Sequence, residues 1–348
     1  MIRSAAIVLR FAILMIGLSL PALSQTNGEL QDYFKNSIGL SQEQIADIRG
    51  GKSVGNVMKS RNPDEIFVWG AVYVKASPES YVQFASDFDR LGKLPEFLAI
   101  RKFSNPPQES DLEGFTLDGD DIKALRECKP SHCEVQLPAQ AIEHFQQSID
   151  WNAPDADRQV NQLLHQRAIE RLREYQSKGN AALGFYHDKR NPTDVSKQFE
   201  YMLSYSQVLP KYVPDFHRYL LAYPDARPQH TEDIFYWAKV KFGLKPTLRV
   251  VQLITMRGTA AGKPACAIAE KQLYSSHYFE TALDLTFCVP DPENPKQPGF
   301  YLIKAMGSEQ AGLTGVKGSI VRKVAVGRTA SSLEKSLVAI KNILEAKQ

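Results

Sequence analysis

Four cysteines are the residues whose spacing predicts the most definite chemistry. Cys128 and Cys133 stand five positions apart, and Cys266 and Cys288 each stand 11 positions from His277, near the bend of a predicted β-hairpin. Directly opposed residues of antiparallel strands have Cα atoms about 4.5–5.5 Å apart, a separation that a disulfide tolerates. We therefore predict two structural disulfides, Cys128–Cys133 and Cys266–Cys288.

The cysteine, histidine and serine residues do not match a standard metal-binding or catalytic motif. Haem attachment needs Cys-x-x-Cys-His, whereas four residues separate Cys128 from Cys133. Zinc would need further cysteines or histidines at regular spacing, and the seven histidines are scattered. Gly307-Ser308 does not continue as the Gly-x-Ser-x-Gly of a serine hydrolase. The sequence thus predicts no metal, no cofactor and no catalytic residue, although an enzyme is kept as an alternative.

Strand alternation singles out two polar side chains among apolar ones. The even positions of 247–257 are apolar except Gln252, and the odd positions of the hairpin around His277 are apolar except Lys271. Successive side chains of a strand point to opposite faces, so both polar groups are predicted to point inward. There they would hold an acidic or hydroxylated ligand head, unless Lys271 pairs with an acid or reaches the rim. Tyr236 is the expected polar neighbour of Lys271. The predicted ligand-binding residues are Tyr236, Gln252, Lys271, Leu283, Leu285 and Leu337.

A second polar group lies at the hairpin bend. His277 is close in sequence to Tyr274, Tyr278 and Glu280. An acid–base site needs these side chains within hydrogen-bond reach of one another, whereas the residues of a bend usually face water. We expect a solvated turn here and treat the cluster as one to test.

Seven segments have the β-branched and aromatic composition of strands: 65–75, 97–103, 234–242, 247–257, 265–274, 279–289 and 300–306. Ser77-Pro78-Glu79 begins a short helix after the first of them. The final helix is predicted at 330–344, because its apolar residues form one stripe. We predict an N-terminal helical or extended segment (25–64), an α+β domain (65–104 plus 231–348) and a mainly helical insertion (105–230).

Composition and charge exclude several classes of protein. The 348 residues are 43% hydrophobic and 23% charged, which is typical of globular proteins and excludes disordered and coiled-coil chains. The net charge of +3 is too small for a dedicated nucleic-acid-binding protein. From Lys239 onward, 16 basic and 8 acidic residues give +8. This basic end either attracts the acidic remainder of the chain or meets an anionic surface such as lipid headgroups.

The first residues have the pattern of a secretory signal. A start with Arg3 and Arg10 is followed by an apolar run at 11–20 and by Ala22-Leu23-Ser24, a small-x-small cleavage pattern. The run is shorter than the roughly 20 residues that span a bilayer. We predict a signal peptide at 1–24, cleavage near Ser24 and a periplasmic or secreted protein. Its oxidising surroundings would keep the two disulfides.

The order of elements resembles a known superfamily. Without residues 105–230 the order is strand, two short helices, six strands and a helix, and EIFVWGAVYVKASPESYVQFASDFDRLGKLPEFLAIRKF looks like the opening of such a domain. This is similar to the START and polyketide-cyclase-like helix-grip (SRPBCC) superfamily. The whole chain, with KQLYSSHYFETALDLTF, also looks like a group of uncharacterised exported bacterial proteins. The resemblance implies a curved antiparallel sheet that grips a C-terminal helix and encloses a cavity.

The resemblance also implies a ligand, a lipid or another hydrophobic small molecule. We therefore expect an exported, non-catalytic binding protein with an apolar cavity. The alternatives are a cyclase- or hydrolase-type enzyme that uses the same cavity, and a protein-interaction module that acts through the helical insertion. Because fold alone does not determine function, the residues that line the cavity must decide between them.

Overall fold

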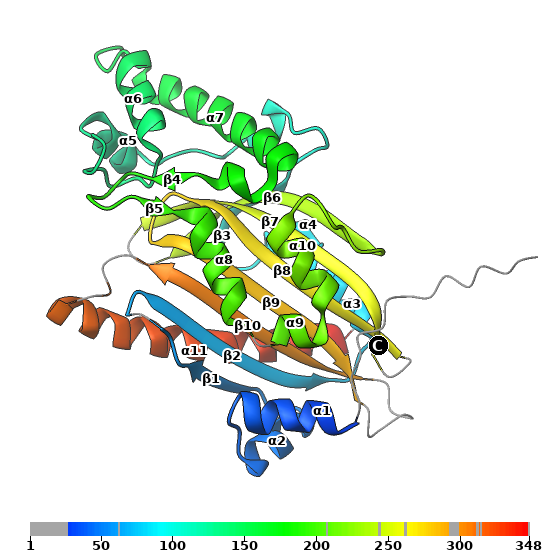
Figure 1. The fold of residues 1–348 in the computed structure, drawn as a ribbon. Coiled ribbons are helices and arrows are strands. Elements are labelled where there is room, and N and C mark those ends of the chain that lie inside the picture. The colour runs from blue at the N-terminus through cyan, green and yellow to red at the C-terminus, as the bar shows by residue number, and fades with distance from the viewer. Residues whose placement is uncertain are drawn as a thin grey trace, which may run out of the picture.

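The computed structural model describes residues 27–346 except 62, 207, 243–244, 261–262, 292–298, 311–312 and 314. The predicted signal peptide lies outside the described residues. The chain is an α+β protein with a large antiparallel sheet and a long C-terminal helix (Figure 1). Within the described residues, no helix is long and apolar enough to cross a membrane.

An eight-stranded antiparallel sheet forms the centre of the molecule, in the order β1-β2-β10-β9-β8-β7-β6-β3. All seven predicted strands are present. The prediction missed β1, whose sequence VGNVM is short and contains Gly and Asn, which are depleted in strands. The strands are β1 (Val54–Met58), β2 (Glu65–Val74), β3 (Phe97–Lys102), β6 (Thr231–Phe242), β7 (Lys245–Ala260), β8 (Lys263–Ser275), β9 (Phe279–Pro290) and β10 (Phe300–Gln310).

Helices cover both faces of this sheet. One face, here called the α11 face, carries α3 (Pro78–Ala85), α4 (Phe88–Leu91) and α11 (Gly315–Glu345). The other, the insertion face, carries the segment between β3 and β6, drawn from teal through green in Figure 1. Its elements are η2 (Glu109–Leu112), α5 (Gly119–Arg126), α6 (Ala139–Ser148), α7 (Ala156–Lys178), η3 (Gly179–Leu183), β4 (Phe185–Tyr186), β5 (Thr193–Asp194), α8 (Val195–Tyr205), α9 (Val208–Tyr212) and α10 (Pro214–Ala222).

The N-terminal helices α1 (Asn27–Asp32), η1 (Tyr33–Ser37) and α2 (Gln42–Arg49) pack at the β1–β2 end of the insertion face. Trp69 of β2 donates a hydrogen bond to Tyr33 Oη at 2.8 Å, and Phe34 lies against the same indole ring. The sheet therefore separates two apolar cores, because side chains alternate between its faces along every strand.

The final helix is longer than predicted. It begins at Gly315 rather than at 330, and residues 315–329 include three glycines and four valines, which have low or modest helix propensity. The predicted stripe of Leu333, Leu337, Ile340 and Leu344 is buried against the sheet. At Gly70 of β2, an added Cβ would lie 2.9 Å from Leu337 Cδ1 and 3.1 Å from Leu333 Cδ2, so the helix packs directly on the strand backbone.

Both predicted disulfides are confirmed. Cys266 and Cys288 are directly opposed in the β8–β9 pairing, as the symmetric hairpin required, with Cα atoms 4.9 Å apart. Cys128 and Cys133 close the loop that follows α5, with Cα atoms 4.6 Å apart. All four cysteines of the chain are thus bonded, which fits an exported protein.

Candidate functional site

Lys271 points inward, as alternation along β8 predicted, and it lies on the insertion face. Its side chain is 1% exposed and donates hydrogen bonds to Tyr175 Oη at 3.0 Å and to Asn180 Oδ1. The ammonium nitrogen lies 4.7 Å from the centre of the Phe199 ring. No carboxylate pairs with it among the described residues. Burial therefore lowers the pKa of Lys271 to about 7.

Gln252 joins Lys271 to a chain of hydrogen bonds. Tyr175 Oη donates to Gln252 Oε1 at 2.6 Å, and Gln252 Nε2 donates to Asp233 Oδ1 at 2.8 Å. Asp233 also accepts from Tyr219 Oη at 2.7 Å and pairs with an arginine, Arg227. Burial raises the pKa of Asp233 and outweighs the donors around it. Aromatic rings of the insertion cover these hydrogen bonds. The polar groups of Lys271, Gln252 and Asp233 thus have their partners within the protein.

Tyr236 is not a neighbour of Lys271, and this part of the prediction is wrong. The β6–β7 register pairs Tyr236 with Val251, which places its side chain on the α11 face, opposite to Gln252 and Lys271. Alternation along one strand cannot reveal this, because the register between strands sets which positions share a face. Leu283 and Leu285 lie with Lys271 on the insertion face, whereas Leu337 lies with Tyr236. The six predicted residues therefore do not form one site, and their roles toward a ligand stay predictions.

The α11 face holds a polar group that the sequence analysis missed. Glu270 and Asp284 are directly opposed on β8 and β9, and Lys304 of β10 stands beside Thr286 of β9. We call this group the inner polar cluster. Its members are Tyr81, Tyr236, Glu270, Asp284, Thr286 and Lys304.

Hydrogen bonds link most of the inner polar cluster. Tyr236 Oη donates to Glu270 Oε2 at 3.0 Å, and Lys304 Nζ donates to Tyr81 Oη at 3.3 Å. Tyr81 Oη in turn donates to Thr286 Oγ1 at 3.4 Å. Burial lowers the pKa of Lys304, but Tyr81 and the two carboxylates outweigh it, so the net direction is upward. The ammonium group is therefore charged at neutral pH.

Asp284 is the exception in this cluster. Among the described residues no hydrogen bond or ion pair reaches its carboxylate, although it is half-buried in the middle of the sheet. Burial is the main cause that raises its pKa to about 6, the nearby Glu270 adds to the rise, and Lys304 and Arg249 oppose it. Its oxygens are not among the fully buried atoms without a partner, so the carboxylate is still accessible to water or to a bound molecule. It can accept a hydrogen bond from a bound molecule, or exchange a proton near neutral pH.

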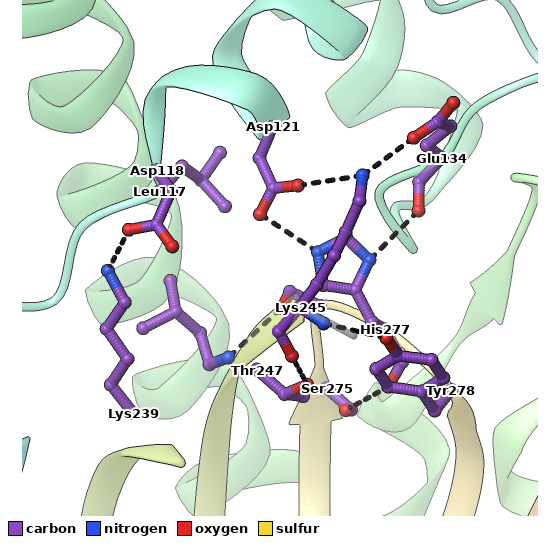
Figure 2. Close-up of polar contacts among 12 residues, drawn as sticks. Leu117, Asp118, Asp121, Glu134, Lys239, Lys245, Thr247, Ser275, His277 and Tyr278 are labelled. Atoms are coloured by element: carbon purple, nitrogen blue, oxygen red, sulfur yellow. Dashed lines mark hydrogen bonds and ion pairs between the residues drawn. The ribbon is translucent and has the colours of Figure 1, made fainter. Parts of the chain in front are cut away.

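The hairpin bend is the third polar region, shown in Figure 2. His277 Nε2 lies 2.9 Å from Asp121 Oδ2, and Nδ1 lies 3.1 Å from the carbonyl oxygen of Glu134. Lys245 bridges the Asp121 and Glu134 carboxylates at 3.3 and 2.7 Å. Burial raises the pKa of Asp121, but the cationic neighbours outweigh it and lower that pKa overall. We call these four residues the insertion clasp, because they join α5 and the following loop to the sheet.

The solvated turn expected at the bend is wrong. His277 is only 5% exposed because the insertion covers the bend, and its partners come from the insertion rather than from Tyr274 or Glu280. Both ring nitrogens are turned toward oxygen atoms of the insertion, so neither points into a space that a substrate could occupy. Ser275 Oγ donates to the backbone carbonyl of His277, not to its ring. The insertion clasp therefore serves packing rather than catalysis.

One further motif is present but lies in the wrong setting. Gly51-Lys52-Ser53-Val54-Gly55 matches Gly-x-Ser-x-Gly, which the sequence analysis passed over. In serine hydrolases the serine stands on a sharp turn from a strand into a helix. Here the motif leads from α2 into β1, the reverse order. Among the described residues there is also no group of three or more side chains arranged to hold a metal ion.

Comparisons with known proteins do not identify a function, so the function must be inferred from the site geometry described above. No model of a known protein family matches the chain, and no curated protein matches it either.

Proposed function

We propose that the protein is an exported binding protein for a hydrophobic or amphipathic small molecule, such as a lipid, held on the α11 face without catalysis. The helix-grip arrangement that the sequence resembles is part of this proposal, with α3 and α11 as the walls opposite the sheet. The observation that carries it is Asp284, a half-buried carboxylate without a hydrogen-bond donor among the described residues. A partly accessible carboxylate in an otherwise apolar layer can accept a hydrogen bond from a bound molecule.

The surroundings of Asp284 support this proposal. Small-molecule sites combine apolar walls with a few convergent polar groups, and the inner polar cluster lies among such walls. Arg249 and Met306, beside the cluster on β7 and β10, are half-buried like Asp284, whereas the β10 side chains nearer its start are fully buried. The apolar residues of this face include Val251, Leu253, Ile268, Leu302, Leu333 and Leu337.

The charges of the cluster restrict the ligand. Two carboxylates, Glu270 and Asp284, face two cations, Lys304 and Arg249. Their formal charges balance, so the cluster offers no net attraction to a strongly anionic head such as a phosphate. A hydroxyl or a neutral amine can donate to Asp284 and accept from Lys304. We infer an amphipath whose polar group is a hydroxyl or an amine.

Fluorescence titration of the mature chain with N-phenyl-1-naphthylamine, a neutral amine probe, tests the proposal. We expect saturable binding that Met306→Trp abolishes by filling the space beside Asp284, and that Asp284→Asn weakens several-fold. Lys271→Met, on the opposite face, is the matched control and should leave the titration unchanged. A titration without saturation, or loss of binding with Lys271→Met alone, rejects the proposal. Native mass spectrometry of the purified protein would identify a co-purifying molecule.

A second candidate, an acid–base enzyme of the cyclase or hydrolase type, is favoured by one observation. The pKa of Asp284, raised by burial to about 6, lies where a general acid or base is most effective. The molecule that co-purifies with Asp284→Asn should then be converted when it is added to the wild-type protein. If mass spectrometry finds it unchanged, the enzyme candidate is rejected and the binding function stands.

A further inference from the structure

The outward face of α11 is apolar at its start. Ile320, Val321 and Val324 are 64%, 55% and 48% exposed, and Val338 further along the helix is also exposed. Positions 320, 324 and 338 share one side of the helix, opposite to the stripe that packs on the sheet. In the view of Figure 1, the first turns of α11 extend past the ends of the neighbouring strands. These apolar side chains are a liability in water unless something covers them.

The same face is basic and free of acids. The helix has no Asp or Glu before Glu334, and Lys323, Arg328 and Lys335 are exposed. Both of its carboxylates turn toward the protein body: Glu334 accepts from the backbone N–H of Gly55 at 2.8 Å, and Glu345 accepts from that of Lys75 at 2.8 Å. The outward face therefore presents only positive charge beside its apolar residues.

We propose that this face docks on the surface of an anionic lipid bilayer. An amphipathic helix binds a membrane interface by placing its apolar residues at the boundary of headgroups and acyl chains, while basic residues meet the anionic lipids. Ile320, Val321 and Val324 supply the apolar part, and Lys323, Arg328 and Lys335 supply the charge.

A second copy of the chain is a poorer occupant of this face. A two-fold symmetric contact brings the same patch of two molecules together, so Lys323, Arg328 and Lys335 would meet their own kind. Like charges brought together in this way are destabilising. The absence of acids from the face thus favours lipid over self-association. The docking surface does not depend on the proposed ligand, although α11 also walls the inner polar cluster.

Flotation of the mature chain with vesicles tests the docking. We expect binding to vesicles of phosphatidylglycerol and phosphatidylcholine, no binding to phosphatidylcholine alone, and release at high salt. Each basic residue near an anionic surface contributes about 1 kcal/mol, which is about fivefold in partitioning. Arg328→Gln with Lys335→Gln should thus weaken binding about 25-fold, and Ile320→Ser with Val324→Ser should weaken it at least tenfold.

Matched controls separate docking from general surface effects. Lys123→Gln on α5 removes another exposed charge, and Leu98→Ser on β3 removes another exposed apolar residue; both should leave binding unchanged. Circular dichroism checks that each variant folds. Absent binding to anionic vesicles, or equal losses in the controls, overturns the proposal. So does a wild-type dimer that Ile320→Ser with Val324→Ser converts to a monomer, because this face would then be an interface between copies.

Discussion

Two buried lysines on opposite faces of one sheet show how differently the two faces are built. Lys271, on the insertion face, has only neutral partners, and burial lowers its pKa to about 7. Lys304, on the α11 face, is also buried, but Tyr81 and two carboxylates raise its pKa instead. The difference shows that the chain of hydrogen bonds from Lys271 through Gln252 to Asp233 is satisfied within the protein. The α11 face keeps charges that only partly satisfy one another, as a site for a bound molecule would.

The largest expected effect is a change in how the free energy of unfolding depends on pH, and it is expected at Lys271. The folded pKa is about 7 and the unfolded value is about 10.4, so the unfolded chain binds more protons between these values and the free energy of unfolding rises with pH there. The full shift corresponds to roughly 4–5 kcal/mol, an upper limit. In Lys271→Met this rise should disappear, which urea unfolding at pH 6, 7.5 and 9 measures.

Lys304→Met is the control for that prediction. Because the folded pKa of Lys304 is raised, its contribution to stability is fully present below the unfolded pKa and is lost only above it. The variant should therefore be less stable than the wild type by the same amount at pH 6, 7.5 and 9. If both variants keep the wild-type dependence on pH, the two faces do not differ as described.

The next largest effect is expected at the insertion clasp. Asp121→Asn removes the charge that faces His277 and Lys245, which should lower the free energy of unfolding at pH 7 by about 2–3 kcal/mol. The folded pKa of Asp121 is lowered, so this contribution is present above the unfolded value near pH 3.9 and is lost as pH falls further. Asp120→Asn, an exposed neighbour on α5, is the control and should change stability by less than about 0.5 kcal/mol.

The smallest effect has the opposite sign. Asp284→Asn removes a carboxylate whose pKa is raised from near 3.9 to about 6, so its destabilisation of the folded state grows between these values and is complete above about pH 6. We expect a gain of roughly 1–2 kcal/mol at pH 7 that vanishes by about pH 4. The pKa of Asp233, on the insertion face, is also raised by burial, but Asp233→Asn should gain less, because the change weakens the hydrogen bonds from Tyr219 and Gln252 and the ion pair with Arg227. A loss of stability with Asp284→Asn would show that its carboxylate is partnered.

Sequence alternation predicted the strands well and the site poorly. The Cys266–Cys288 bond and the inward positions of Gln252 and Lys271 follow from distances within one hairpin or along one strand. The rest needed longer-range information. Glu270 and Asp284 alternate with apolar residues just as solvent-facing residues do, and nothing local indicates that helices cover both faces of the sheet.

The contacts of the insertion clasp could not be predicted from the sequence either. His277 and Asp121 are 156 positions apart, and their contact depends on how the insertion lies on the sheet. The start of α11 was missed because propensity alone does not predict helix for its glycines and valines. There Arg322 of α11 donates to the backbone carbonyl of Pro63 at 2.9 Å, a tertiary contact that no local pattern contains.

Gly70 of β2, which has no side chain, affects how the protein could change over evolution. Leu333 and Leu337 rest where a methyl group would stand, so the clearance between the last helix and the sheet is set by a hydrogen atom. A methyl group at this point would force the ends of both leucine side chains to shift. The packing of the last helix over the layer that contains Asp284 is thus sensitive to one substitution, at a strand position that bears no polar side chain of its own.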